Sequence, residues 1–450
     1  MKIAANIAGI DKIPIFTFLS FFSFPCFSVT LEKSKGARIM YTSGIIAEYN
    51  PFHNGHRLQI EKIRKKLGAD ASIVVCMSGA FTQRGSAAIL SKGVRARCAV
   101  ENGADLVIEL PTVFAVRSAQ YFAEGGVRLL AALGIVDTLS FGTETDDAEF
   151  ISSIAERLQS GETQQAIRST MKDGLSYAAA VTKALSLTAD EADALRRPNT
   201  ILAVEYLRAI HTFAPELHAL PLLREGSAYN DTELSGKYPS ASAIRNSIMK
   251  HGLTEALRTA VPASVFSSLT AEKSFPERER LFRPLLAKLY TMTPSDLAAG
   301  FGISEGLENR ILEAAKNADS LEDFCIDLRS RRYPMSRITR TLLALLLSFS
   351  PSELMEFDRL GPLYIRVLAF NERGRGLLKI IREKSRLPII SRVRPFLRHG
   401  ADEPDNMAQR MLRYDTLASD IRGLMLDPIP HAGEDFLLSP VYVKPISQKS

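Results

Sequence analysis

The sequence has few cysteines and histidines, the residues that form disulfides and most zinc sites. Its 450 residues include four cysteines, Cys26, Cys76, Cys98 and Cys325, which stand far apart and mostly in apolar segments. They show neither the short spacing of metal ligands nor the density of a disulfide framework. No cluster of cysteine and histidine indicates a structural zinc. These shortages argue against a disulfide-stapled secreted domain, favour a reducing cytoplasm, and leave no metal ligand to assign.

Long hydrophobic runs are also missing, except near the start. Residues 13–31 are apolar and rich in Phe, which is typical of a signal peptide or a membrane anchor. The composition changes abruptly before Met40, and we expect residues 1–39 to be a non-native leader upstream of the true translation start. The apolar run at 342–347 is too short to span a bilayer, so no membrane partner is expected.

The size and charge of the chain limit its class. With 46% apolar residues, 450 residues can bury a large core, and we expect two domains, residues 40–250 and 251–450. The formal net charge of +6 permits a polyanionic partner without requiring one. There is no internal repeat and no low-complexity linker.

Strands and helices alternate in the first of these regions. Apolar segments at 72–77, 104–110 and 136–141 are separated by helical patterns at 91–102 and 118–133. Such a sequence predicts an α/β fold with a Rossmann-like parallel sheet covered on both faces. Ligands of these sheets bind at the carboxyl ends of the strands.

The most informative stretch is Gly44–His56. It predicts a short buried strand to Ala47, a turn at Asn50-Pro51 and a helix that begins near Asn54. His53 would precede that helix and His56 would lie in its first turn, with Gly55 between them allowing a ligand to approach the backbone. A helix N-terminus suits phosphate, and two imidazoles there could stabilise charge during attack on an α-phosphorus. The alternative is an ordinary turn with two surface histidines.

The string His53-Asn54-Gly55-His56 resembles the H-x-G-H signature of the nucleotidyltransferase superfamily. The longer string from Ala47 to His56 resembles the bacterial tRNA(Met) cytidine acetate ligase family, with further similarity in blocks to about Val443. This resemblance implies catalytic roles for His53 and His56. It implies ATP contacts from Ile46, Ala47, Glu48, Tyr49, Asn50, Pro51, Phe52, His53, Asn54, Gly55, His56, Gly142, Asn199, Arg224 and Ser242.

Local patterns support the later members of that set, although each has a plain structural alternative. Gly142 follows a strand, Asn199 follows Pro198 at a helix start, and Arg224 ends a segment whose Pro221 favours a sheet edge. Ser242 lies in a Ser-rich turn that opens a helix and equally suits a helix cap.

The loop after the second strand carries Ser78, Gln83 and Arg84, which could meet a carboxylate or phosphates or merely connect two elements. The family usually has Glu-Pro and Asp-Lys pairs beyond this loop. Here Ser86-Ala87 and Ser91-Lys92 stand instead, so only Lys92 matches.

The region from about Leu253 is predicted to be mostly α-helical and becomes basic, with an arginine cluster at 329–340 and a second run at 366–398. A solvated helix face is the usual explanation for such runs. Beside an ATP-activating domain they favour binding of RNA phosphates, and Arg331, Arg332 and Arg337 are the candidate tRNA contacts.

Taken together, the resemblance implies a ligase that converts acetate and ATP into acetyl-adenylate and pyrophosphate. The acetyl group would then pass to the wobble cytidine of elongator tRNA(Met), and Mg²⁺ is expected with the phosphates. Two other classes stay open: a small-molecule adenylyltransferase of cofactor biosynthesis, and a non-enzymatic RNA-binding protein with a relict nucleotide fold. Nothing in the sequence indicates an oligomeric state.

Overall fold

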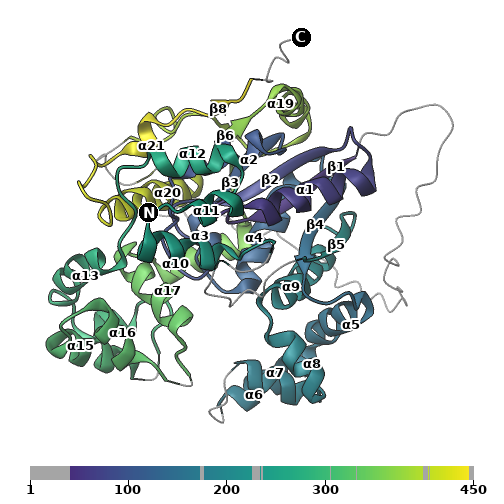
Figure 1. Ribbon diagram of the computed structural model, residues 1–450. Coiled ribbons are helices and arrows are strands. Elements are labelled where there is room, and N and C mark those ends of the chain that lie inside the picture. Colours follow the sequence, from purple (N-terminus) through teal and green to yellow (C-terminus); the bar gives the residue numbers. More distant parts are fainter. Residues whose placement is uncertain are drawn as a thin grey trace, which may run out of the picture. The chain divides into compact units, whose positions relative to one another are not determined.

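The computed structural model describes residues 41–172, 177–225, 234, 237–304, 306–330, 332–398, 404 and 406–444, all within one compact unit. The predicted leader lies outside the described residues. Within them, eight strands form one sheet in the order β5-β4-β1-β2-β3-β6-β7, with β8 beside β6 (Figure 1). The strands are β1 (Thr42–Ala47), β2 (Ser72–Ser78), β3 (Leu106–Leu110), β4 (Thr138–Thr143), β5 (His218–Leu223), β6 (Ile365–Phe370), β7 (Ile389–Ile390) and β8 (Val441–Tyr442).

Helices connect and cover these strands. Their bounds in the described residues are α1 (Asn54–Leu67), α2 (Lys92–Glu101), α3 (Thr112–Ala115), α4 (Ala119–Ala132), α5 (Ala148–Gln159), α6 (Gly161–Lys172), α7 (Tyr177–Ala184), α8 (Ala189–Arg196), α9 (Pro198–Phe213), α10 (Ala241–His251), α11 (Glu255–Ala260), α12 (Ala263–Ala271), the 3₁₀ turn η1 (Arg278–Leu281), α13 (Phe282–Leu289), α14 (Pro294–Ala298), α15 (Leu307–Asn317), α16 (Leu321–Leu328), α17 (Met335–Leu346), α18 (Pro351–Leu360), α19 (Glu372–Lys384), α20 (Met407–Gly423) and α21 (Glu434–Leu437).

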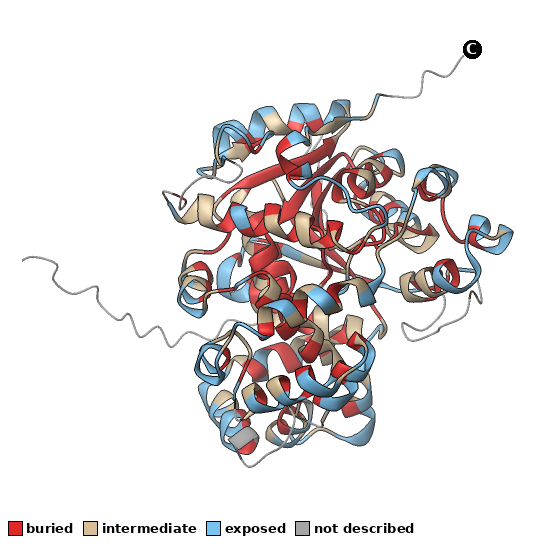
Figure 2. Ribbon diagram, turned by 90° about the vertical axis from the view of Figure 1, so that its left-hand side faces the viewer, coloured by how far each residue is buried: buried red, intermediate tan, exposed pale blue. Residues whose placement is uncertain are grey.

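The sheet is buried on both faces, as β2 shows most clearly. Val74 and Cys76 belong to the apolar core that also holds residues of α4 and α9, whereas Ile73, Val75 and Met77 belong to a second core with residues of α1 and α2. Successive side chains of a strand point to opposite faces, so an unbroken apolar strand needs helices on both sides. Figure 2 shows the strands as the buried centre and the outer turns of the helices as exposed.

The strand order reverses next to β1. From β1 the chain runs outward through β2 and β3, and it then returns to the other side of β1 for β4 and β5, all in parallel. Such a reversal leaves a crevice at the carboxyl ends of the two strands that flank it. The predicted parallel sheet is confirmed, and β5 lies at the edge, as Pro221 indicated.

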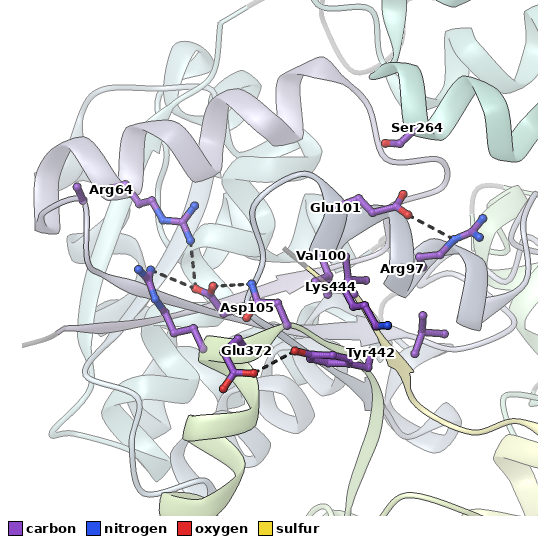
Figure 3. Close-up of a pocket in the computed structure, with 14 residues that line it drawn as sticks. Arg64, Arg97, Val100, Glu101, Asp105, Ser264, Glu372, Tyr442 and Lys444 are labelled. Carbon is purple, nitrogen blue, oxygen red and sulfur yellow. Dashed lines mark hydrogen bonds and ion pairs between the residues drawn. The ribbon is translucent and has the colours of Figure 1, made fainter. Parts of the chain in front are cut away.

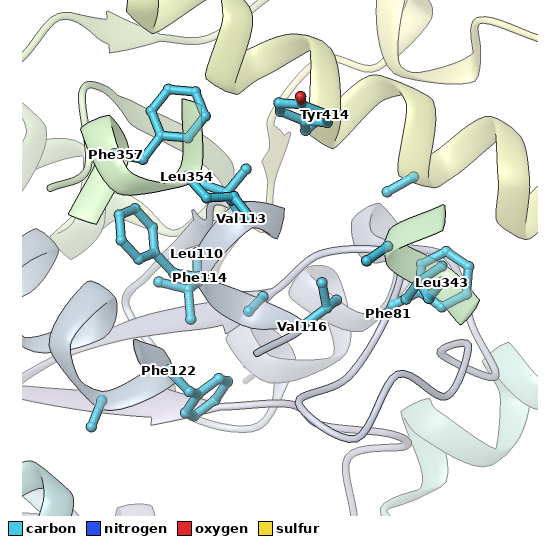
Figure 4. Close-up of a cluster of buried hydrophobic side chains, with 14 of the residues drawn as sticks. Phe81, Leu110, Val113, Phe114, Val116, Phe122, Leu343, Leu354, Phe357 and Tyr414 are labelled. Atoms are coloured by element: carbon cyan, nitrogen blue, oxygen red, sulfur yellow. The ribbon is translucent and has the colours of Figure 1, made fainter. Parts of the chain in front are cut away.

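The region after residue 250 is mostly helical, but it also contributes strands that the helical expectation missed. β6 pairs antiparallel with β3, and β7 and β8 pair with β6. Helices of this region share a core with the sheet, since Leu354 and Phe357 of α18 and Tyr414 of α20 belong to the same apolar cluster as Val113 and Phe114 (Figure 4). Strand pairing and core packing therefore join the residues before and after position 250. A separate tRNA-binding domain at 251–450 stays a proposal.

Three of the four cysteines lie among the described residues. Cys76, Cys98 and Cys325 are buried free thiols, and Cys26 lies outside the described residues. In the part of the chain that the structure describes, no helix combines the length and the apolar character needed to cross a membrane.

Candidate active site

The turn between β1 and α1 is held by contacts from distant segments. Asn50 Oδ1 accepts a hydrogen bond from Ile89 N at 2.7 Å, and the Asn50 carbonyl accepts one from Arg245 Nη1 at 2.6 Å. Tyr49 has a φ of 46°, in the left-handed region that bulky residues rarely adopt. Its buried ring packs edge-on against Phe52, with 4.8 Å between ring centroids. Packing and hydrogen bonds together thus fix an unusual turn.

His53 and His56 accept backbone hydrogen bonds at the start of α1. Gly55 N donates to His53 Nδ1 at 3.1 Å, and His53 N donates to His56 Nδ1 at 3.2 Å. A neutral imidazole accepts at one nitrogen and donates from the other, so Nε2 of each ring carries the proton. The two rings are stacked, with centroids 3.7 Å apart. The helix begins at Asn54, as predicted.

Both rings are held neutral at pH 7. Burial, together with the positive charges of Arg224 and Arg245, lowers the pKa of His53 to about 3. The pKa of His56 also lies well below its usual value, because of burial and because His53 and Arg224 are close. Each ring can therefore donate a hydrogen bond from Nε2 to a phosphate oxygen without adding a positive charge beside the other ring.

The two histidines line a cavity of about 310 Å³ at the carboxyl end of the sheet. Gly142 of β4 and Arg224, directly after β5, also line it, next to the crevice where the strand order reverses. The predicted site residues that line this cavity are Ile46, Ala47, Glu48, Tyr49, Asn50, His53, His56, Gly142, Asn199, Arg224 and Ser242.

The remaining predicted ATP contacts lie just outside that cavity. Gly55 lines a small adjoining pocket of about 40 Å³ together with Arg224. Phe52 is buried against His56, with ring centroids 5.5 Å apart, and Asn54 Nδ2 donates to the Thr259 carbonyl at 2.8 Å. Pro51 belongs to the same turn. Phe52 and Asn54 thus support the turn, and an ATP contact from them stays a prediction.

Asn199 is oriented by an acidic residue that the sequence did not single out. Its Nδ2 donates to Glu144 Oε1 at 2.6 Å, and Glu144 Oε2 accepts from the backbone nitrogens of Asn199 and Thr200 at 3.2 and 3.3 Å. A carboxylate at a helix N-terminus satisfies donors that have no partner within the helix. Both hydrogen bonds between Asn199 and Glu144 use nitrogens of Asn199 as donors, and a nucleoside contact from the Asn199 side chain stays a prediction.

The start of α10 provides a second helix N-terminus in the cavity. Ser240 Oγ accepts from Ala243 N at 3.0 Å and caps the helix, so Ser242 lies in its first turn rather than at the cap. Arg245 Nη2 donates to Ser242 Oγ at 3.1 Å. Hydroxyl, guanidinium and free backbone N–H groups together suit a polyphosphate.

Other residues of the site escaped sequence reasoning. Ser336 and Arg340 of α17 line the cavity although they lie far along the chain, in the cluster predicted to bind tRNA. Arg95, fully buried in α2, donates through Nη1 to the Glu48 carbonyl and through Nη2 to the carbonyls of Ser78 and Gly79. Burial lowers the pKa of Arg95 to about 9. An arginine among small and apolar residues was its only sequence signal.

A buried ion cluster corrects one expectation. Lys92 Nζ lies 2.6 Å from Glu109 Oε1 and 2.7 Å from Asp435 Oδ2. Arg366 Nη1 lies 2.9 Å from Glu109 Oε2 and 2.8 Å from Asp435 Oδ2. Arg366, which sequence analysis placed in a surface basic run, is therefore buried and paired. Lys92, the residue that matched the family pattern, joins α2 to β3 and α21.

The tRNA candidates are only partly described. Arg331 lies outside the described residues. The Arg337 guanidinium stacks over the Tyr333 ring at 4.4 Å, and its Nη1 donates to the Arg332 carbonyl at 3.3 Å. Arg337 lies on α17, the helix whose Arg340 lines the nucleotide cavity.

A larger cavity of about 960 Å³ lies at the opposite end of the sheet (Figure 3). Asp105, which precedes β3, accepts through Oδ2 from Ile73 N at 2.8 Å and from Arg64 Nη2 at 3.1 Å. Its Oδ1 accepts from Asn371 Nδ2 at 2.9 Å. Because this carboxylate is satisfied within the protein, the smaller cavity that holds the histidines remains the candidate active site.

Comparisons with known proteins show the family of this chain. The family model for HIGH nucleotidyl transferases matches residues 40–434. A curated relative from Halothermothrix orenii, named tRNA(Met) cytidine acetate ligase, is 35% identical over 417 residues, which cover 88% of this chain and 98% of the relative.

Solved structures give the same result. The apo crystal structure of Thermotoga maritima TmcAL matches with a TM-score of 0.83 and 30% identity, over 90% of this chain and 100% of that one. The structure of the same protein bound with alpha-thio ATP matches with a TM-score of 0.81 and 29% identity over the same shares. The chain therefore belongs to the HIGH nucleotidyl transferase family and, within it, to the tRNA(Met) cytidine acetate ligases.

Proposed function

We propose that this protein uses ATP to activate acetate as acetyl-adenylate and then transfers the acetyl group to the exocyclic amine of the wobble cytidine in elongator tRNA(Met). The observation that carries this proposal is the single cavity that holds two neutral histidines together with Asn199, Arg224 and Ser242. The name of the curated relatives and the ATP analogue bound to the Thermotoga maritima protein support it.

In the first step, an acetate oxygen forms a bond to the α-phosphorus of ATP while the bond from that phosphorus to the pyrophosphate oxygen breaks. Negative charge on the α-phosphate oxygens is stabilised by Nε2–H of His53 and His56. Arg224 and the N-terminal turn of α10 with Ser242 would hold the departing pyrophosphate. Asn199 would hold the nucleoside where Gly142 leaves room for close approach.

In the second step, the cytidine amine attacks the carbonyl carbon of the mixed anhydride. The bond between that carbon and the AMP oxygen breaks, and the amine loses a proton. Acetate itself is unreactive toward amines, so the adenylate must form first and be shielded from water. Because α17 borders the cavity, tRNA held by Arg331, Arg332 and Arg337 would lie beside the adenylate.

We also propose that magnesium accompanies ATP. Mg²⁺ prefers phosphate and water oxygens with few protein ligands, and it would neutralise charge on the phosphates. Among the described residues, no group of three or more His, Cys, Asp or Glu is arranged to hold a metal ion. In this proposal the triphosphate supplies most of the magnesium ligands.

The test is exchange of labelled pyrophosphate into ATP by the full chain, first with acetate alone and then with tRNA added. We expect exchange that requires acetate, followed by acetylated cytidine in elongator tRNA(Met), with initiator tRNA(Met) as the control. Exchange driven only by a small phosphorylated cofactor precursor would instead favour an adenylyltransferase of cofactor biosynthesis. Binding of RNA with no exchange at all would favour a non-enzymatic RNA-binding protein.

A further inference from the structure

One wall of the nucleotide cavity is positively charged and comes from two distant parts of the chain. Gln83 and Arg84 belong to the loop after β2, and Ser336 and Arg340 belong to α17. Loop and helix touch through their backbones, because a Cβ at Gly85 would lie only 3.2 Å from Arg340 N. The wall is thus a fixed part of the fold.

The strand order places this wall on the far side of β1 from Gly142 and Arg224. Gly142 lies near the end of β4 and Arg224 follows β5, both on one side of β1, whereas Arg84 follows β2 on the other side. The two histidines follow β1, in the middle. In a displacement at phosphorus, the attacking and leaving oxygens lie roughly in line. If pyrophosphate leaves toward Arg224, the attacking carboxylate must approach from the side of β2.

We propose that Arg340, with Arg84 beside it, binds the carboxylate of acetate and holds it for attack on the α-phosphorus. This inference rests on the proposed function. A guanidinium presents a planar fork of donors that matches the two oxygens of a carboxylate. One oxygen forms the new bond to phosphorus while the other stays with the guanidinium, and the step moves no proton.

The charges around Arg340 suit an anionic substrate. Burial and the neighbouring Arg84 and Arg337 lower the pKa of Arg340 to about 10, which leaves it charged at pH 7. Among the described residues, the Arg340 guanidinium has no hydrogen-bond or ion-pair partner. Glu48 lines the same cavity, and its Oε1 accepts from Gln83 N at 2.8 Å, so this carboxylate holds the loop in place.

The experiment measures acetate-dependent pyrophosphate exchange without tRNA in the full chain, for wild type, Arg340→Gln and Arg340→Lys. We expect the KM for acetate to rise about tenfold or more in Arg340→Gln and less in Arg340→Lys, with the KM for ATP within about twofold. Arg359→Gln is the matched control, because Arg359 is an exposed arginine of α18 that pairs with Glu356. Thermal unfolding of each variant shows whether it is folded. If Arg340→Gln does not fold, Arg84→Gln, at an exposed position of the β2 loop, should show the same rise.

The outcomes are distinguishable. Unchanged acetate KM in folded Arg340 and Arg84 variants, while wild type exchanges normally, would overturn the inference and leave the proposed function standing. In a parallel tRNA acetylation assay, a higher KM for tRNA with an unchanged KM for acetate would also overturn it, since the arginines would then hold an RNA phosphate. Absence of acetate-dependent exchange in wild type would refute the proposed function itself.

Discussion

His53 and His56 are the residues on which the proposed chemistry depends most directly. Removing a preorganised donor from a site of developing charge costs on the order of a hundredfold in rate. We therefore expect His53→Ala and His56→Ala each to lower acetate-dependent exchange by about a hundredfold or more. His251→Ala, at the exposed end of α10, is the control. Normal exchange in both active-site variants, with unchanged thermal unfolding, would remove the histidines from the mechanism.

The protonation of His53 leads to a prediction about stability. In the unfolded chain this ring takes up a proton near pH 6.5, whereas in the folded protein its pKa is about 3. Between these values the unfolded state binds more protons, so stability falls as the pH falls, by about 1.4 kcal/mol per unit for such a group. Urea unfolding measures the free energy of unfolding at pH 7 and at pH 5. The decrease between these pH values should be smaller for His53→Gln than for wild type. An equal decrease in both proteins would mean that the His53 ring takes up a proton as readily in the folded protein as in the unfolded chain.

Single residues also show how far sequence reasoning reached. The strand, the turn at Asn50-Pro51, the helix start and the helix at Pro198 all depend on neighbouring residues, and these elements were predicted. Arg340 could not be assigned to the cavity, because the contact of α17 with the β2 loop leaves no local pattern. The same reason hid the partners of Arg366, whose charge suggested a surface position.

At the scale of elements, the cluster of Lys92, Glu109, Arg366 and Asp435 ties α2, β3, β6 and α21 together. It contains two positive and two negative groups, all buried. Lys92→Met should leave an uncompensated negative charge and cost about 3–5 kcal/mol of unfolding free energy.

The double variant Lys92→Met with Glu109→Met restores charge balance, so we expect it to be more stable than the single variant. Denaturant unfolding measures both, with Lys62→Met on the half-exposed surface as the control. A double variant less stable than the single one would show that packing, not charge, holds these elements together.

At the scale of the whole molecule, strands from beyond residue 250 complete the sheet, and α17 reaches the nucleotide cavity. If the basic cluster at residues 329–340 binds tRNA phosphates, affinity should fall steeply with salt, because each neutralised phosphate releases counterions. Replacing Arg331, Arg332 and Arg337 together should weaken tRNA binding and reduce the slope of log K against log salt by about one unit per lost contact.

Filter binding at several salt concentrations measures this change. Unchanged affinity and slope would remove these arginines from the RNA surface. A simultaneous loss of tRNA-independent exchange would show that α17 serves both substrates at one site, which would remove the boundary at residue 250.

The central claim is that acetate attacks the α-phosphorus directly, and oxygen labelling tests it most closely. In a reaction with ATP, tRNA(Met) and acetate labelled with ¹⁸O at both oxygens, the attacking oxygen should remain on AMP when the acetyl group leaves. Mass spectrometry should therefore find one ¹⁸O in each AMP formed and the other in the acetylated cytidine. AMP without label, or label in pyrophosphate or inorganic phosphate, would contradict the account.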